Sequence, residues 1–211
     1  VLLKENSYIC KNITNNRVIF MIVQFSVGNF LSFKELSTLS LVATNLKETA
    51  IADADSMAEM DDAIPAILHG AAIYGANASG KSNFAKALST FKWLVINSMK
   101  ELQAGEALNV ESFMLNVKTA HEPSLFEMVF CHDAYIYRYG CEIDSKKVHK
   151  EWLYRRNNKK RAKEVELLFR EDSTYNVHPS CAIMRNLVTN KMVRDNALLV
   201  SVAAQFNDET A

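Results

Sequence analysis

The segment Gly75-Ala76-Asn77-Ala78-Ser79-Gly80-Lys81-Ser82 decides the fold, because it matches the phosphate-binding pattern Gly-x-x-x-x-Gly-Lys-Ser. Glycines and small residues let the backbone approach a phosphate closely and present successive N–H groups to it. The ammonium of Lys81 is expected to contact the β- and γ-phosphates, and the hydroxyl of Ser82 to ligate Mg²⁺. The pattern predicts a nucleoside triphosphate site for ATP with Mg²⁺. Its expected contacts are Gly75, Ala76, Asn77, Ala78, Ser79, Gly80, Lys81, Ser82 and the following Asn83.

The sequence on either side of this loop has the context that the motif requires. The apolar run from Ile67 to Tyr74 predicts a buried strand of a parallel sheet that ends at the loop. After the loop, apolar residues recur at spacings of three or four between Ser82 and Leu102, which predicts an amphipathic helix. A strand–loop–helix unit favours nucleotide binding over the alternative, a glycine-rich turn without a ligand.

The remaining chain predicts an α/β fold rich in strands. Strands are expected within 22–27, 37–43, 148–155 and 164–170, and the last third of the chain is expected to form short helices. The runs 124–131 and 135–143 predict a hairpin that turns at His132-Asp133-Ala134.

Composition places the chain among ordinary globular proteins. Its 211 residues are 49% hydrophobic, and the charges balance at 24 − 24 = 0, so net charge favours neither nucleic acid nor membrane as a partner. No apolar run reaches the ~18 residues of a membrane span, and no signal peptide is recognisable. Four cysteines without metal-like spacing are better explained as small buried hydrophobes in a reducing compartment than as a metal or redox site, so we expect a cytoplasmic protein.

Two charged segments have alternative interpretations. The basic run 155–163 is either a solvated turn between strands or a nucleic-acid contact through Arg155, Arg156, Lys159, Lys160, Arg161 and Lys163. The acidic segment 47–63 is interpreted as a solvated face, since its carboxylates lack the spacing of a calcium loop.

The loop residues 75–83 resemble those of ABC-type ATPases of the SMC and RecF kind, and Asn29-Phe30-Leu31-Ser32-Phe33 resembles a turn of that group. The stretches 126–130, 135–140, 151–153, 168–170 and 197–201 are similar to a narrower branch, the prokaryotic AAA-family ATPases similar to RloA and to abortive-infection ATPases.

The resemblance implies an incomplete ABC-type head with an antiparallel β subdomain beside a parallel P-loop core. Residues 21–211 would be the N-terminal part of the ATP-binding domain. Residues 1–20 are polar and Asn-rich with little periodicity, so we expect them to be an N-terminal extension. The resemblance further implies a homodimer with ATP held between two heads, in a DNA-related or anti-phage role. Gln205 would reach Mg²⁺ as the glutamine of the family's Q-loop, unless it is an ordinary surface residue. Phe30 and Phe33 either line a base pocket or pack in the core.

The chain departs from this family in ways that bear on hydrolysis. ATP hydrolysis needs carboxylates for Mg²⁺ and for the attacking water, which the family supplies as four hydrophobic residues followed by Asp-Glu. No such segment occurs, and no Gly-Gly pair of a signature loop occurs either. We therefore expect the N-terminal portion of a longer ATPase, with exposed hydrophobic surface where a central strand is missing. Whether the chain is an enzyme stays open. The alternatives are a non-catalytic nucleotide-binding module or inactive fragment and, less favoured, a P-loop kinase or GTPase.

Overall fold

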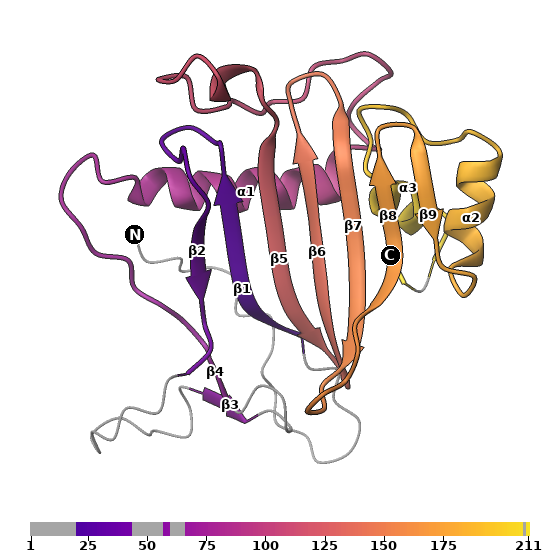
Figure 1. The fold of residues 1–211 in the computed structure, drawn as a ribbon, viewed down its shortest axis with the longest axis horizontal. Coiled ribbons are helices and arrows are strands. Elements are labelled where there is room, and N and C mark those ends of the chain that lie inside the picture. The colour runs from indigo at the N-terminus through magenta and orange to yellow at the C-terminus, as the bar shows by residue number, and fades with distance from the viewer. Residues whose placement is uncertain (1–19, 44–56, 60–65, 209) are drawn as a thin grey trace.

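A seven-stranded antiparallel sheet with one long helix across one face forms the body of the protein (Figure 1). The computed structural model describes residues 20–43, 57–59, 66–208 and 210–211. The strand order is β2-β1-β5-β6-β7-β8-β9. The strands are β1 (Phe20–Gly28), β2 (Ser37–Ser40), β5 (Ser124–His132), β6 (Tyr135–Ile143), β7 (Val148–Asn157), β8 (Val165–Glu171) and β9 (Thr174–Val177). A separate two-stranded sheet joins β3 (Met57–Glu59) to β4 (Ala66–Leu68).

Four of the expected strands and the expected hairpin are confirmed by this sheet. The β5–β6 hairpin turns through Asp133, which adopts a left-handed φ of 52°. Asp tolerates that conformation better than most residues, and this explains the tight connection. Strand β9 was not expected from the sequence, because its four residues are half polar and follow β8 after a short turn.

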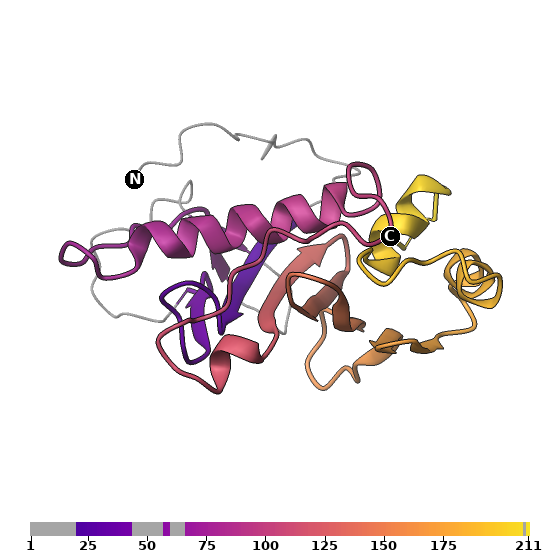
Figure 2. The same cartoon turned by 90° about the horizontal axis from the view of Figure 1, so that it is seen from above.

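Helix α1 (Lys81–Asn97) lies across the strands and closes the main hydrophobic core (Figure 2). Its apolar stripe brings Phe91 against Phe25, Phe126 and Tyr139, with ring centroids 5.8–6.1 Å apart. The helix expected over Ser82–Leu102 is confirmed, although it ends five residues earlier. Two short helices, α2 (Ala182–Thr189) and α3 (Leu199–Gln205), follow the sheet, as expected for the last third of the chain. A 3₁₀ turn, η1 (Thr119–His121), precedes β5.

The strand expected over Ile67–Tyr74 is wrong beyond Leu68. Only Ala66–Leu68 form a strand, and its pairing with β3 is antiparallel. Ile67 is buried, whereas Ile73 and Tyr74 are 44% and 90% exposed. In the described part of the chain no strand pairs with residues 71–74. The described residues therefore contain no parallel core, and Ile73 and Tyr74 expose apolar surface.

Two expectations fall largely outside the described residues. Of the extension 1–20 only Phe20 is described, and of the acidic segment 47–63 only β3. Among the described residues, no helix is long and apolar enough to cross a membrane.

Candidate functional site

The phosphate loop lies at the N-terminal end of α1, where two left-handed residues shape it. Ala78 has φ 64° and Gly80 has φ 90°, and the N–H of Ser79 donates to the carbonyl of Ala76 at 3.3 Å. These conformations turn the chain sharply into the helix, which begins without a side-chain cap on its first N–H groups. Uncapped N–H groups at a helix N-terminus, together with the helix dipole, favour an anion.

Lys81 folds back over the loop that precedes it. Its ammonium donates to the carbonyls of Gly75 at 2.8 Å and Ala76 at 2.6 Å, and to the hydroxyl of Ser79 at 3.4 Å. The loop backbone therefore holds a positive charge beside the helix N-terminus. Gly75 and Gly80 have little room for a side chain, because an added Cβ would lie 2.7 Å from the Ser79 hydroxyl and 3.2 Å from the Ser32 hydroxyl.

The turn Asn29–Phe33 contacts the first turn of α1, directly after the phosphate loop. The Asn83 side-chain amide donates to the Ser32 hydroxyl at 2.8 Å, so the side chain of Asn83 is engaged with this turn. The Phe33 ring packs edge-on against Phe84 at 6.0 Å between centroids. Phe30 is only 3% exposed and packs edge-on against Phe126 at 5.1 Å, which agrees with its interpretation as a core residue.

Asn29 is a structural residue of this turn that the sequence did not single out by itself. It is buried, with a φ of 47°, and its side-chain amide donates to the carbonyls of Thr119, Glu122 and Pro123. Its side-chain oxygen accepts from the N–H of Phe113 at 3.2 Å. One asparagine thereby ties the turn behind the phosphate loop to the segment before β5.

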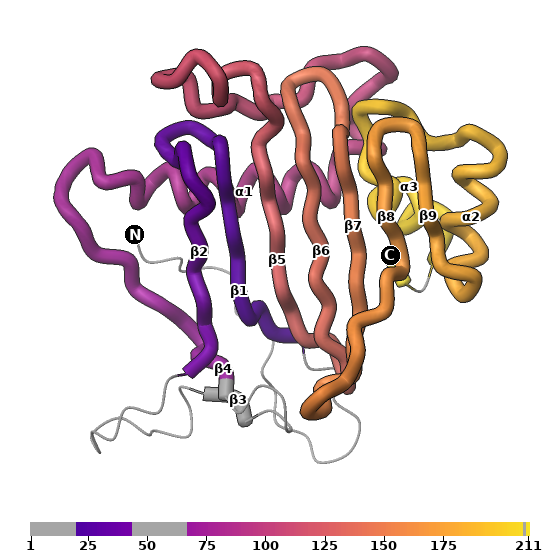
Figure 3. The backbone as a smooth tube through the Cα atoms, viewed as in Figure 1, coloured from indigo at the N-terminus to yellow at the C-terminus, as the bar shows by residue number. Residues whose placement is uncertain are grey.

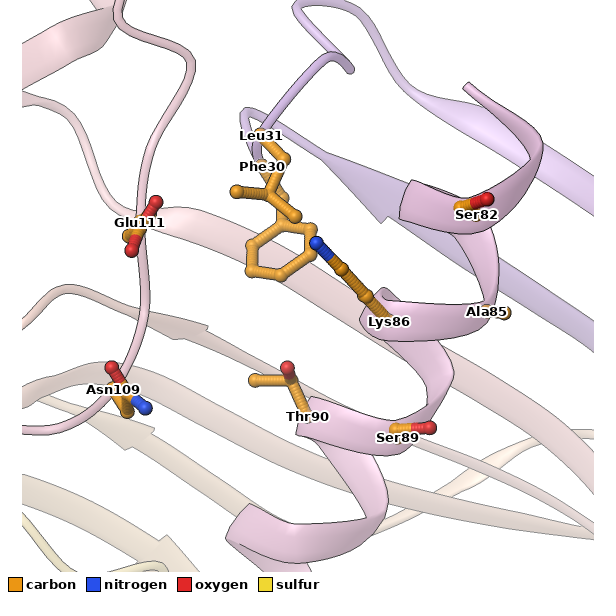
Figure 4. Close-up of a pocket in the computed structure, with 9 residues that line it drawn as sticks. All are labelled: Phe30, Leu31, Ser82, Ala85, Lys86, Ser89, Thr90, Asn109 and Glu111. Atoms are coloured by element: carbon orange, nitrogen blue, oxygen red, sulfur yellow. The ribbon is translucent and has the colours of Figure 1, made fainter. Parts of the chain in front are cut away.

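A groove of about 570 Å³ runs along α1 from Ser82 (Figure 4). The helix side chains Lys86 and Thr90 form one wall, Asn109 and Glu111 face them from the segment after α1, and Phe30 and Leu31 lie between. Its size falls within the ~300–1,000 Å³ typical of small-molecule sites. Sequence reasoning missed Asn109 and Glu111, because only the fold brings them beside the helix.

The structure does not bring Gln205 to Ser82 within one chain. The Ser201 hydroxyl of α3 donates to the carbonyl of Val95, near the C-terminal end of α1. Val95 lies fourteen residues beyond Lys81, or roughly 21 Å along a helix that rises 1.5 Å per residue. Gln205 is exposed at the end of α3, far from the phosphate loop.

The other candidate residues lie apart from the loop. The basic run 155–163 forms the end of β7 and the turn into β8, with its lysines exposed, as expected for a solvated turn. Cys131, Cys141 and Cys181 are free and buried, as expected, and burial raises the pKa of Cys131 to about 11. The described residues contain no group of three or more His, Cys, Asp or Glu side chains that could hold a metal ion.

Comparison with known families identifies the segment around the loop. A family model described as "AAA domain, putative AbiEii toxin, Type IV TA system" matches residues 71–182, a little over half of the chain. The matched region includes the phosphate loop, α1 and the strands β5 to β9. The match does not single out the SMC and RecF branch. No curated protein and no solved structure gives a significant match.

Proposed function

The chain belongs to the AAA domain family of putative AbiEii toxins of type IV TA systems, and from this premise we propose that it binds ATP with Mg²⁺ through residues 75–83. The observation that carries the proposal is the arrangement of Lys81. Its ammonium lies 2.8 Å and 2.6 Å from two loop carbonyls, beside the uncapped first turn of α1. A triphosphate placed there meets backbone N–H groups and one cation together.

The roles of the individual loop residues follow from this placement. The backbone N–H groups of 75–80 surround the β-phosphate, and Lys81 moves its ammonium from the loop carbonyls to the β- and γ-oxygens. Ser82, the first exposed hydroxyl of the helix, ligates Mg²⁺, a cation that prefers oxygen and keeps several waters. Asn83 positions the loop through Ser32.

The groove that begins at Ser82 is the candidate for the nucleoside. The half-buried Leu31 offers it an apolar surface, whereas Asn109 and Glu111 offer hydrogen-bonding groups that can orient a ribose or a base.

The proposal extends to ATP hydrolysis and to assembly of the protein. We place the chain in an ABC-type, SMC- and RecF-like ATPase in which two heads enclose ATP and residues outside this chain supply the catalytic carboxylates. Its setting is anti-phage defence of the abortive-infection or toxin–antitoxin kind, in the cytoplasm. The exposed segment Ala71–Tyr74 supports this, because its apolar side chains Ile73 and Tyr74 offer a surface to another part of the ATPase. The absence of an apolar strand ending in Asp-Glu favours the second candidate, a module that binds ATP without hydrolysing it.

Calorimetry with ATP and Mg²⁺, combined with phosphate release in the same samples, tests the proposal. Lys81→Ala removes a charge-assisted contact worth about 1.5–3 kcal/mol, so the affinity for ATP should fall at least tenfold. Lys92→Ala, an exposed lysine of the same helix, is the matched control and should leave the affinity unchanged.

Each result has a definite meaning. Binding without turnover supports the non-hydrolysing module, and turnover by this chain alone shows that it supplies its own carboxylates. Absence of ATP binding, or equal loss in both variants, rejects the proposed site.

A further inference from the structure

Four aromatic side chains form a continuous ladder across β1, β5 and β6. The ring centroids are 5.3 Å apart for Phe20 and Phe130, 5.3 Å for Phe130 and Tyr137, and 6.3 Å for Tyr137 and Tyr135. Phe20 is 57% exposed and the other three rings are half-buried. Helix α1 crosses the strands nearer their other end (Figure 1), so this helix does not cover the end of the sheet that carries the ladder.

The ladder leads directly to the basic turn between β7 and β8. The guanidinium of Arg155 lies over the Tyr135 ring, 4.6 Å from its centroid. The N–H of Asn158 donates to the carbonyl of Ala134 at 2.9 Å, so the β5–β6 and β7–β8 turns are hydrogen-bonded to each other. Figure 3 shows both turns at the same end of the sheet.

The positive charge of this turn is concentrated in a short stretch of sequence. Residues 155–163 carry six of the chain's 24 basic side chains and no carboxylate, in a protein whose net charge is zero. Among the described residues, none of the six has an ion-pair partner within 4.0 Å. The neighbouring Glu164 is already paired with Arg138 at 2.6 Å, and Glu166 accepts from Tyr154 at 3.0 Å.

We propose that this end of the sheet binds single-stranded nucleic acid, with unpaired bases stacked on the aromatic ladder and phosphates held by the basic turn. A surface that acted through charge alone would bind a duplex equally well. Partly exposed aromatic rings, by contrast, stack only with bases that are not paired in a duplex. The contact between Arg155 and Tyr135 places a positive charge beside a stacking ring. A nucleotide needs both, since its base stacks on the ring and its phosphate binds the cation. This surface is separate from the phosphate loop.

Fluorescence anisotropy with a labelled 20-nucleotide oligothymidine tests the inference on the full chain. Loss of one stacking ring typically costs about 5- to 150-fold in affinity, so Tyr135→Ala should weaken binding within that range. Tyr135→Phe keeps the ring and should bind like the unmodified chain, which separates stacking from a general folding defect. Thermal unfolding of both variants provides the folding control.

The salt dependence tests the basic turn independently. Each phosphate contact contributes about −0.7 to the slope of log affinity against log salt for a single strand, so six contacts give about −4. Lys159→Gln with Lys160→Gln should flatten the slope by about 1.4, whereas the control pair, Lys92→Gln on α1 with Lys100→Gln in the turn after it, should not change it.

Three results would overturn the inference. The first is no binding of the oligonucleotide at micromolar protein in low salt. The second is the same affinity for a duplex of that sequence as for the single strand, together with no effect of Tyr135→Ala. The third is the same affinity for polyglutamate as for the oligonucleotide. The last would identify an acidic polypeptide as the partner. Because Lys81→Ala should leave oligonucleotide binding intact, failure here is distinguishable from failure of the ATP site.

Discussion

Removing the carboxylate of Glu151 should destabilise the protein more than any surface substitution. Glu151 is 0% exposed and accepts from the N–H groups of Leu199 at 2.7 Å and Val200 at 3.1 Å, and from the Tyr139 hydroxyl at 3.0 Å. The guanidinium of Arg170, itself 1% exposed, lies 3.9 Å away. This carboxylate therefore anchors the start of α3 on the sheet.

The magnitude follows from what Glu151→Ala leaves behind. Breaking a buried ion pair from one side costs about 3–5 kcal/mol, because the remaining charge stays buried without its counter-ion. Arg170 keeps its bonds to the carbonyls of Ala197 and Asp195, which do not neutralise it. For a domain of this size, such a loss lowers the melting temperature by roughly 6–20 °C.

Urea unfolding followed by circular dichroism measures this change. Glu142→Ala, in the adjacent strand and paired with Lys150 at 3.4 Å near the surface, is the control and should cost less than about 1 kcal/mol. The double change Glu151→Leu with Arg170→Met should cost less than Glu151→Ala, because it removes both charges. An unfolding free energy for Glu151→Ala within 1 kcal/mol of the unmodified chain would refute the reasoning.

Four further predictions concern the loop, the groove and individual side chains. Gly80→Ala should weaken ATP binding at least tenfold in calorimetry, since φ 90° strains a Cβ that would also lie 3.2 Å from Ser32; unchanged affinity would contradict the loop geometry. Thr90→Phe should fill the groove and weaken ATP binding while tripolyphosphate binds as before; equal effects on both would exclude the nucleoside from the groove. Burial tends to raise the pKa of Asp144, but hydrogen bonds from His149 and from two backbone N–H groups outweigh burial and lower this pKa. The ionised carboxylate therefore stabilises the fold above the ordinary pKa near 3.8, and this stabilisation is lost as the pH falls through the lowered pKa. Asp144→Asn should accordingly destabilise at pH 6 and converge with the unmodified chain in acid unfolding, and a constant difference would disprove the linkage. With burial raising the pKa of Cys131 to about 11, its thiol should react with a disulfide reagent at pH 8 only in urea, and fast native reaction would contradict its burial.

Local patterns in the sequence predicted local elements well. The helix after the phosphate loop and the β5–β6 hairpin were predictable because periodicity and turn residues act over a few positions. The prediction of a strand up to Tyr74 was wrong because a strand also depends on residues that are distant in the sequence. An apolar run forms a strand only where a neighbour accepts its hydrogen bonds, and the described residues provide none beyond Leu68.

The candidate site was likewise only partly predictable. Residues 75–83 were identified by type and spacing alone, since a phosphate cradle is built from consecutive backbone groups. The groove residues Asn109 and Glu111 carry no such signal, and the role of Asn29 depends on carbonyls about 90 residues away.

The sequence by itself determined the phosphate loop, its helix and the charges of the basic turn, because each of these resides in neighbouring residues. Only the tertiary structure decided that β1 pairs with β5 across some 95 residues, that Glu151 and Arg170 meet in the core, and that an aromatic ladder leads to the basic turn. The physical reason is that strand pairing, desolvation and stacking depend on partners brought from distant parts of the chain, whose identity no local pattern records.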